Sequence, residues 1–295
     1  MEAEKSWKPF CVSHMNKPSD ERKLRGMICL DLDGTLFNQE NEVTERNRQS
    51  MHSCLEKGLQ VYLVTGRPYC FSKSLAIQID SRIGVIASAG ACYEKEGKLI
   101  EYPIADEAVG CFLDVLKEFD TAHAFLKGLR SFYTHDPYDK HFLYDHMNGW
   151  FPEELQVTSF IEQSFEEMKE KAKDIHKILV YDMDKEKLAA LEERVKMIPS
   201  LCVSRYNDIS FDVTAVGTSK GNAIRDIQES LGIEKSQILA IGDAPNDLPM
   251  FEAAGIRIAM ANAKPEIAKY CDETTGSNCE DGVAQVLERA EQYFS

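Results

Sequence analysis

The sequence predicts an α/β fold in which a parallel sheet is interrupted by an inserted α+β segment. Two observations predict this fold. From residue 27 onward, and again near the C-terminal end of the sequence, short apolar runs alternate with longer helical patterns, which is typical of βαβ units. Between these two stretches, roughly over residues 91–208, strand patterns outnumber helical ones, which favours a mixed insert.

The strands of the parallel sheet are expected at four apolar runs, Met27–Leu30, Val61–Val64, Val85–Ala87 and Ile238–Ile241. Helices are expected over Val43–Lys57 and Ser219–Leu231. Thr44 would cap the first of them, with Asn47 completing only part of a capping box. Each strand is followed at once by small or polar residues. Because ligands bind at the carboxyl ends of strands in open parallel sheets, these distant polar groups should converge at one edge.

The insert is expected to contain five strands, Lys98–Pro103, Ala122–Leu126, Ser131–His135, Lys177–Asp182 and Leu201–Tyr206. It should also contain two helices, Asp106–Glu118 and Asp184–Ile198. The second helix has an apolar stripe that should pack on the sheet, made by Leu188, Leu191, Val195 and Ile198. The predicted organisation is therefore an N-terminal extension (1–25), a core domain (26–90 and 209–295) and the insert (91–208).

Composition excludes several functional classes. Hydrophobic residues make up 43% and charged residues 28% of the chain, as in ordinary soluble globular proteins. With 34 basic and 49 acidic residues the formal charge is −15, which argues against a nucleic-acid partner. The N-terminus lacks an apolar signal segment, and no apolar run approaches 18 residues, so we expect no secretion and no membrane partner. Nine scattered cysteines without a CxxC pair predict reduced thiols in the cytoplasm. Oligomeric state is left open.

The stretch MICLDLDGT (27–35) places Asp31 and Asp33 directly after a buried-looking strand. In an extended chain both carboxylates would point to the same side. Two such charges repel by roughly 4 kcal/mol at ~4 Å and an effective dielectric near 20. One interpretation is a pair of solvated turn carboxylates, with Gly34 allowing the bend. The other is a shared divalent cation, for which Mg²⁺ is the natural choice because it binds carboxylates, waters and phosphate oxygens.

Three further motifs carry polar groups to strand ends or helix starts. In IGDAPND (241–247), Asp243 and Asp247 are either a helix cap with a first-turn acid or a second pair of metal ligands. Lys220 lies at the start of a helix, where the helix dipole disfavours a positive charge. We therefore interpret it as a residue that faces a phosphate, and the alternative is an ordinary surface lysine. Thr65-Gly66-Arg67 ends a strand and could bind a phosphoryl oxygen, although this tripeptide fits many turns. Together these parts suit phosphoryl transfer through an aspartyl-phosphate.

With these motifs in order, DLDGT (31–35), Thr65, Lys220 and GDAPND (242–247), the sequence resembles the haloacid dehalogenase superfamily of phosphohydrolases over about residues 27–290. The position of the insert looks like the type 2 cap of the Cof-type subfamily. IAMANA (258–263) and EDGVAQVL (280–287) are also similar to Cof-type segments. The resemblance implies a Rossmann-like core with a cap, and a Mg²⁺-dependent phosphatase.

The resemblance also implies roles for individual residues. Asp31 would be the nucleophile and Asp33 the general acid and base. Thr65 and Lys220 would hold the transferring phosphoryl group. The metal would be bound by Asp31, the backbone carbonyl of Asp33, Asp243 and, through water, Asp247. The residues expected beside phosphate or substrate are Gly34, Gly66, Arg67 and Asn246.

In one respect the chain departs from many Cof-type relatives, which carry Asn-Gly-Ala where this sequence has Ala89-Gly90-Ala91. A side-chain amide that is common near the substrate in those relatives is thus absent, so the substrate of a relative is not assigned directly to this chain. The cap should select the substrate, and its stretch Gly128–Phe151 is rich in Arg, His and aromatic residues. Packing of the cap sheet, contact with substrate, and a metal site formed by His135, His141 and His146 are the alternatives there.

The expected function is hydrolysis of a small phosphorylated metabolite, such as a sugar phosphate or a phosphorylated cofactor. Two alternatives remain open at this point. A phosphomannomutase-like enzyme would retain the phosphoryl group rather than give it to water. A non-catalytic phospho-ligand sensor or phosphoacceptor would bind without turnover, although Asp33 and the large insert argue against it.

Overall fold

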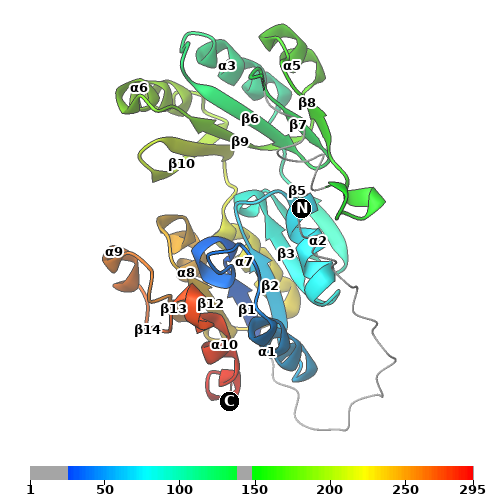
Figure 1. Cartoon of the computed structure of the whole chain (residues 1–295), viewed down its shortest axis with the longest axis vertical. Coiled ribbons are helices and arrows are strands. Elements are labelled where there is room, and N and C mark those ends of the chain that lie inside the picture. Colours follow the sequence, from blue (N-terminus) through cyan, green and yellow to red (C-terminus); the bar gives the residue numbers. More distant parts are fainter. Residues whose placement is uncertain (1–25, 138–147, 295) are drawn as a thin grey trace, which may run out of the picture.

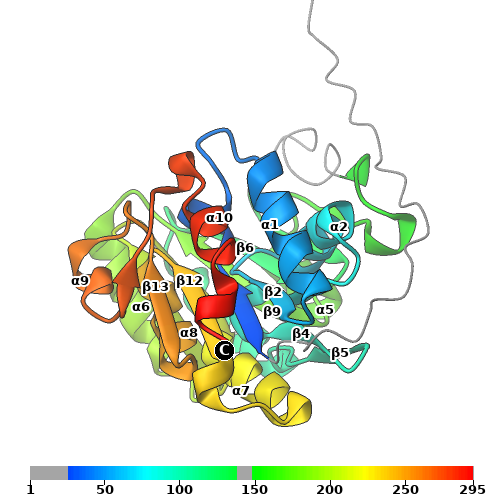
Figure 2. The ribbon, with the colours of Figure 1, turned by 90° about the horizontal axis from the view of Figure 1, so that it is seen from below.

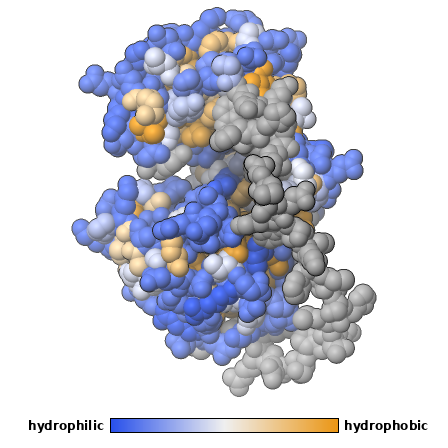
Figure 3. Space-filling view, in the orientation of Figure 1, coloured by the Kyte–Doolittle hydropathy of each residue, from blue (hydrophilic) through white to orange (hydrophobic). Residues whose placement is uncertain are grey.

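The computed structural model describes residues 26–137 and 148–294, and these form two sheets (Figure 1). The first has eight strands in the order β14-β13-β12-β1-β2-β3-β4-β5, and the second has six in the order β10-β11-β9-β6-β7-β8. Figure 1 shows the second sheet and its helices above the first, and the space-filling view shows a waist between the two parts (Figure 3).

The first sheet is parallel from β14 to β3, while β4 and β5 run antiparallel at its edge. Its strands are β1 (Met27–Leu30), β2 (Gln60–Val64), β3 (Gly84–Ala87), β4 (Cys92–Lys95), β5 (Lys98–Glu101), β12 (Ile238–Gly242), β13 (Ile256–Ala259) and β14 (Glu273–Thr274). All residues of β1 are fully buried. Because β1 lies between β12 and β2, its carboxyl end lies beside the ends of both neighbours.

Helices cover both faces of the first sheet (Figure 2). Ile28 and Leu30 pack with α1 (Glu45–Glu56), α2 (Tyr69–Ile79) and α10 (Gly282–Leu287). Met27 and Cys29 point to the other face and pack with α7 (Lys220–Leu231), α8 (Leu248–Ala253) and α9 (Pro265–Ala268). This alternation follows from the two-residue period of a strand and explains why the whole run is apolar.

The second sheet is antiparallel except for the β7–β8 pair. Its strands are β6 (His123–Gly128), β7 (Ser131–Tyr133), β8 (Thr158–Phe160), β9 (Ile175–Tyr181), β10 (Leu201–Asn207) and β11 (Ser210–Ala215). Three helices, α3 (Asp106–Leu116), α5 (Phe165–Lys171) and α6 (Lys185–Lys196), pack on one face in a single apolar cluster. In Figure 1 these helices lie on the side away from the first sheet.

Short helical turns complete the described structure. A turn of π-helix type spans Leu32–Leu36. The 3₁₀ turns span Ser88–Gly90, Glu153–Leu155, Lys235–Gln237, Pro245–Asp247, Asn278–Glu280 and Ala290–Gln292. Two of these turns, with the π-type turn, directly follow β1, β3 and β12, so the carboxyl edge of the first sheet is built largely from tight turns.

The predicted α/β class, the parallel strands and the two flanking helices are confirmed, with small shifts at the ends. Thr44 caps α1 as predicted, accepting a hydrogen bond from the Asn47 N–H. The Asn47 side chain does not close a capping box, however. It accepts from the Ala284 N–H and so connects α1 to α10.

The strands at the two expected boundaries of the insert belong to a different sheet from the one that the predicted boundaries imply. We predicted an insert over 91–208, but β4 and β5 extend the first sheet and β11 belongs to the second. The physical reason is local pairing, because β4 folds back on β3 after the turn Ser88–Gly90, and β11 forms a hairpin with β10. The predicted N-terminal extension lies outside the described residues.

Within residues 26–137 and 148–294, no helix has the length and apolar character that crossing a membrane requires. The described cysteines are free, and Cys29, Cys54, Cys70 and Cys92 are buried in the cores of the two sheets. These thiols act as small apolar side chains, as expected for Cys29.

A matched pair of valines tests the core assignment. Val61 in β2 is 1% exposed, whereas Val216, just after β11, is 64% exposed. Val61→Ala should lower the free energy of unfolding by about 2 kcal/mol, because it removes buried methyl groups and leaves a cavity. Val216→Ala should change it by less than ~0.5 kcal/mol. Urea denaturation measures both, and equal losses would contradict the assignment of β2 to the core.

Candidate active site

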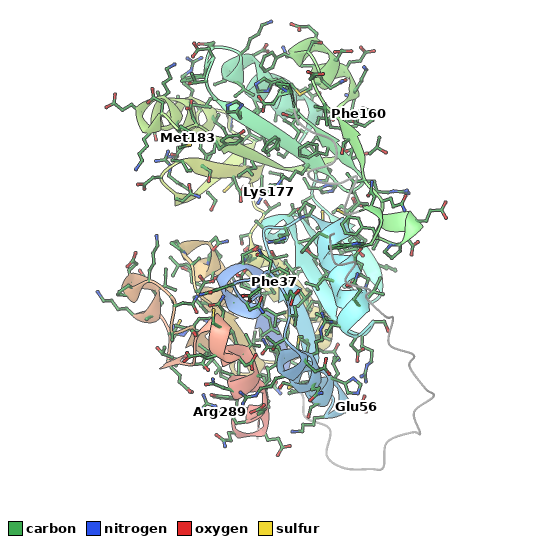
Figure 4. All side chains as sticks on the ribbon, viewed as in Figure 1. Phe37, Glu56, Phe160, Lys177, Met183 and Arg289 are labelled. Atoms are coloured by element: carbon green, nitrogen blue, oxygen red, sulfur yellow. The ribbon has the colours of Figure 1, made fainter. Side chains whose placement is uncertain are left out.

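The candidate site lies at the carboxyl edge of the first sheet, where three neighbouring strands end. Asp31 follows β1, Thr65 follows β2, and Asp243 follows β12. Phe37, labelled in Figure 4, lies near this edge on the side that faces the second sheet. The predicted convergence of polar residues from distant parts of the chain is therefore observed.

Lys220 makes the central contact of the site. Its Nζ donates hydrogen bonds to Asp31 Oδ1 and to Asp247 Oδ1, both at 2.6 Å. All three side chains are buried, with Lys220 2%, Asp31 4% and Asp247 0% exposed. Lys220 is the first residue of α7, which Ser219 caps by accepting from the Asn222 N–H. The lysine predicted to oppose the helix dipole thus faces two carboxylates.

Burial acts on both partners of this contact. Burial and the neighbouring Asp247 raise the pKa of Asp31 well above its usual value, against the lowering effect of Lys220. Burial alone would lower the pKa of Lys220, but Asp247 and Asp31 outweigh it and raise that pKa above the usual range. The lysine therefore stays charged, and its charge favours the ionised form of Asp31 against the effect of burial.

Asp243 and Asp247 complete an oxygen-rich cluster with Asp31. Asp243 Oδ1 accepts from Thr35 Oγ1 at 3.0 Å, and Asp247 Oδ2 accepts from the N–H groups of Asp243 and Ala244. Burial and Asp247 raise the pKa of Asp243 to about 6. Asp31, Asp243 and Asp247 each offer an oxygen within 4.8 Å of the others. Three carboxylates against one lysine leave an excess of negative charge, and this donor set suits a hard divalent cation.

Asp33 has surroundings unlike those of Asp31. Its side chain is 53% exposed and pairs with Arg67 through Nε···Oδ2 at 2.9 Å and Nη2···Oδ1 at 2.5 Å. The Arg67 guanidinium also lies 5.0 Å from the ring centre of Phe37 and 4.5 Å from that of Phe71. The two acids that look alike in the sequence therefore differ in burial and in partner.

Gly34 allows the chain to turn sharply directly after Asp33. Its φ of +82° is favourable only for glycine, and a Cβ there would collide with the Asp243 carboxylate. The Gly34 carbonyl accepts from Asn262 Nδ2 at 2.7 Å, which connects the IAMANA segment to the site. Asn262 was not among the predicted site residues, although its segment was noted as similar to a Cof-type segment.

The Thr65–Arg67 turn is held by the residues that follow β3. Thr65 is fully buried, and its Oγ1 accepts from the Arg67 N–H at 3.1 Å. The N–H groups of Ser88 and Ala89 donate to the carbonyls of Arg67 and Thr65. Ser88, Ala89 and Gly90 all have left-handed backbone angles, with φ of 48°, 57° and 99°.

Gly90 also touches the segment that carries Lys220. A Cβ at Gly90 would collide with the Ser219 carbonyl, immediately before Lys220. The bend at 88–90 therefore sets the distance between the Thr65 turn and the start of α7. At this bend the sequence departs from the Asn-Gly-Ala of many Cof-type relatives, and the glycine that the geometry requires is retained.

Two more residues near the turn carry polar groups. Asn246, in the turn after β12, has a buried Oδ1 with no partner among the described residues. The Gly66 carbonyl accepts from Nζ of Lys177, a residue of β9 in the second sheet, at 2.9 Å. Lys177 was not predicted as a site residue, and strand alternation in β9 was the signal that could have placed it on the face away from the helices.

His141 and His146 of the suggested metal triad lie outside the described residues. The structure groups His135 instead with His123 and Asp136. His123 Nδ1 lies 2.6 Å from Asp136 Oδ1, and His135 Nε2 lies 3.5 Å from it. The His123 ring stacks on Tyr181 at 4.6 Å, so packing and a carboxylate hydrogen bond account for this cluster.

Comparison with known proteins places this geometry in context. A family model for haloacid dehalogenase-like hydrolases matches residues 28–287. The putative phosphatase YxeH of Bacillus subtilis is 30% identical over 274 residues, covering 88% of this chain and 96% of that protein. The 5-amino-6-(5-phospho-D-ribitylamino)uracil phosphatase YwtE of B. subtilis is 29% identical over 282 residues, covering 89% and 96%.

Two further matches extend the comparison. A phosphoglycolate phosphatase of Methanothermobacter thermautotrophicus is 26% identical over 263 residues, covering 89% of this chain and 97% of that protein. A solved haloacid dehalogenase-like hydrolase from B. subtilis superposes with a TM-score of 0.76 at 26% identity, covering 90% of this chain and 99% of its own. The similarity thus includes both sheets.

The contact between Gly90 and Ser219 can be tested with a matched glycine. Gly97 also has a left-handed φ, of +72°, but a Cβ added there would have nothing within 4 Å. Gly97→Ala should therefore cost about 1–2 kcal/mol of unfolding free energy from backbone strain alone. Gly90→Ala should cost roughly 1–3 kcal/mol more, because the methyl group collides with backbone. Equal losses in urea denaturation would show that this contact does not constrain the start of α7.

Proposed function

The chain belongs to the haloacid dehalogenase-like hydrolases, as a Cof-type phosphatase, and on this premise we propose a Mg²⁺-dependent mechanism through an aspartyl-phosphate on Asp31. The enzyme is a phosphoric monoester hydrolase. The observation that carries the proposal is the buried contact of Lys220 with Asp31 and Asp247, beside Asp243. It holds the Asp31 carboxyl group where a phosphoryl group would meet the Lys220 ammonium and several hydrogen-bonding groups.

In the first half of the reaction, an Asp31 carboxylate oxygen attacks phosphorus. The bond between phosphorus and the ester oxygen breaks, and Asp33 donates a proton to the leaving oxygen. The half-exposed position of Asp33, next to the side that faces the second sheet, supports this role. The buried position of Asp31 supports the role of nucleophile, since Lys220 offsets the repulsion between two anions.

In the second half, water attacks the phosphorus of the aspartyl-phosphate. Asp33 accepts a proton from that water, the bond between phosphorus and the Asp31 oxygen breaks, and inorganic phosphate leaves. Lys220, the Thr65 hydroxyl and the backbone of Gly66 and Arg67 would hold the phosphoryl oxygens during both halves. The unpartnered Asn246 Oδ1 supports a contact with a hydroxyl of the substrate.

Mg²⁺ would be held by Asp31 and Asp243 with the backbone carbonyl of Asp33, and Asp247 would support it through water. When bound, the ion would offset the negative charge of the phosphoryl group. The excess of carboxylates and the raised pKa of Asp243 support such a site. Oxygen ligands favour Mg²⁺ over softer metals.

We propose a small phosphorylated metabolite as the substrate, either a sugar phosphate or a phosphorylated cofactor. The names of two relatives specify small phosphate esters, a phosphoribitylamino-uracil and phosphoglycolate. Because these relatives are phosphatases, the similarity favours transfer of the phosphoryl group to water over a phosphomannomutase-like transfer or a non-catalytic sensor.

Removal of the metal should stop turnover. Phosphate release from p-nitrophenyl phosphate should require Mg²⁺, cease with EDTA and return with excess Mg²⁺. Asp243→Asn should raise the Mg²⁺ concentration for half-maximal activity by roughly tenfold or more, because it removes a ligand. Asp208→Asn, which changes a 79% exposed carboxylate, is the matched control and should leave it unchanged. Full activity in EDTA would contradict the proposed metal dependence.

Substitutions of the two acids of DLDGT should affect turnover and phosphoenzyme formation differently. Asp31→Asn should abolish both turnover and phosphoenzyme, because the attacking oxygen is lost. Asp33→Asn should slow turnover by about 10²–10⁴-fold, since only proton transfer is impaired, and phosphoenzyme should still form. Rapid quenching followed by mass spectrometry of the intact protein measures retained phosphate. Wild-type turnover by the Asp31 variant would exclude it as the nucleophile.

A further inference from the structure

The face of the second sheet that points away from α3, α5 and α6 carries charged residues next to the candidate site. In β6, Ala124 and Leu126 are buried against the helices, so Lys127 lies on the opposite face. By the same alternation Lys177 of β9 and Asp212 of β11 lie on that face. Figure 4 shows Lys177 on the side of the second sheet that faces the first.

Lys177 contacts the Thr65–Arg67 turn directly, and Asp212 lies beside it. Lys177 Nζ donates to Asp212 Oδ2 at 2.6 Å and to the Gly66 carbonyl at 2.9 Å. A Cβ at Gly66 would lie 3.1 Å from Lys177 Nζ and 3.9 Å from Asp212 Oδ2. A substrate whose phosphate lies at the Thr65–Arg67 turn would therefore extend its leaving group along this face.

Among the described residues, Lys127 has no ion-pair partner of its own. It lies directly opposite Lys177 in the β6–β9 register, and like charges placed so are destabilising. Asp212 is already paired with Lys177. Among residues 26–137 and 148–294, the Lys127 ammonium makes no hydrogen bond or ion pair. Burial, and then the charge of Lys177, lower the pKa of Lys127 to about 8, against the raising effect of Asp212, which is shared with Lys177.

Asp212 has a second oxygen that lacks a partner. The residue is 7% exposed, and its Oδ1 is buried with no hydrogen bond to the described residues. A buried carboxylate oxygen normally has a donor, because leaving it unpaired costs about 1–3 kcal/mol. A hydroxyl group brought by a ligand would satisfy it.

Building on the proposed phosphatase function, we propose that Lys127 binds a second anionic group on the leaving group of the substrate, and that Asp212 accepts a hydrogen bond from a hydroxyl beside it. The substrate class is then a hydroxylated phosphate ester that carries a carboxylate or a second phosphate. Such an anion would remove the repulsion between Lys127 and Lys177, and the hydroxyl would satisfy Asp212 Oδ1.

Matched esters test this subsite. 3-Phosphoglycerate differs from sn-glycerol 3-phosphate in a carboxylate, and fructose 1,6-bisphosphate differs from fructose 6-phosphate in a second phosphate. For at least one pair, the wild type should prefer the anionic ester by tenfold or more in kcat/KM. Lys127→Met should lower this ratio at least tenfold, and Lys127→Arg should retain part of it. The pair that responds identifies the anion as carboxylate or phosphate.

Lys98→Met, which changes an exposed lysine of β5, is the matched control and should leave both ratios unchanged. Because Lys127 carries an uncompensated charge, Lys127→Met should be at least as resistant to urea as the wild type. If it fails to fold, Lys127→Gln replaces it. Ratios that stay the same in the Lys127 variants, for both pairs, would overturn the proposal.

A binding measurement separates this proposal from the phosphatase mechanism. Calorimetry with Asp31→Asn should show tighter binding of the anionic ester, and the additional Lys127→Met change should remove the difference. If no ester is hydrolysed but this binding difference is found, the mechanism fails and the anion subsite stands. If esters are hydrolysed and neither rate nor binding depends on Lys127, the mechanism stands and the subsite fails.

Discussion

The buried contact of Lys220 with Asp31 and Asp247 is the interaction on which the rest of the site depends. It joins the end of β1 to the start of α7, 189 residues later in the chain, and both to the turn after β12. Removing one partner of such a buried group typically costs about 3–5 kcal/mol, because the remaining charge is left uncompensated. The same charges that bind these segments together are those that a phosphoryl group and a metal would meet.

The second sheet also contacts the candidate site. Lys177 contacts the Gly66 carbonyl, so the turn that would hold phosphate is contacted from both sheets. In the proposed mechanism the first sheet supplies the reacting groups, and the second sheet contacts the part of the substrate that is attached to the phosphate. Residues near Lys177 can therefore affect the choice of ester without touching Asp31 or Lys220.

Much of this architecture could be predicted from local patterns. The apolar runs marked β1, β2, β3 and β12, because strands buried on both faces are continuously hydrophobic. Asp31, Asp33 and Asp243 were singled out because charged residues directly after such runs are costly to bury, and Lys220 because it begins a helix against the helix dipole. The strand β5 was expected in the insert but forms the edge of the first sheet, and β4 and β11 were not predicted as strands, since strand pairing depends on turns and not on composition. The left-handed bend at 88–90 and the position of Lys177 depend on tertiary contacts, which single-chain patterns do not reveal.

The order of strands has a consequence for how the protein is made. β1 pairs with β12, and Asp31 meets Lys220, which lies 189 residues later in the chain. During synthesis from the N-terminus, β1 and Asp31 emerge long before β12 and Lys220, although β2 follows β1 early. The second sheet, whose strands are contiguous in the chain, can form in that interval. The proposed nucleophile thus leaves the ribosome before its counter-charge has been synthesised, and the pairing of β1 with β12 comes last.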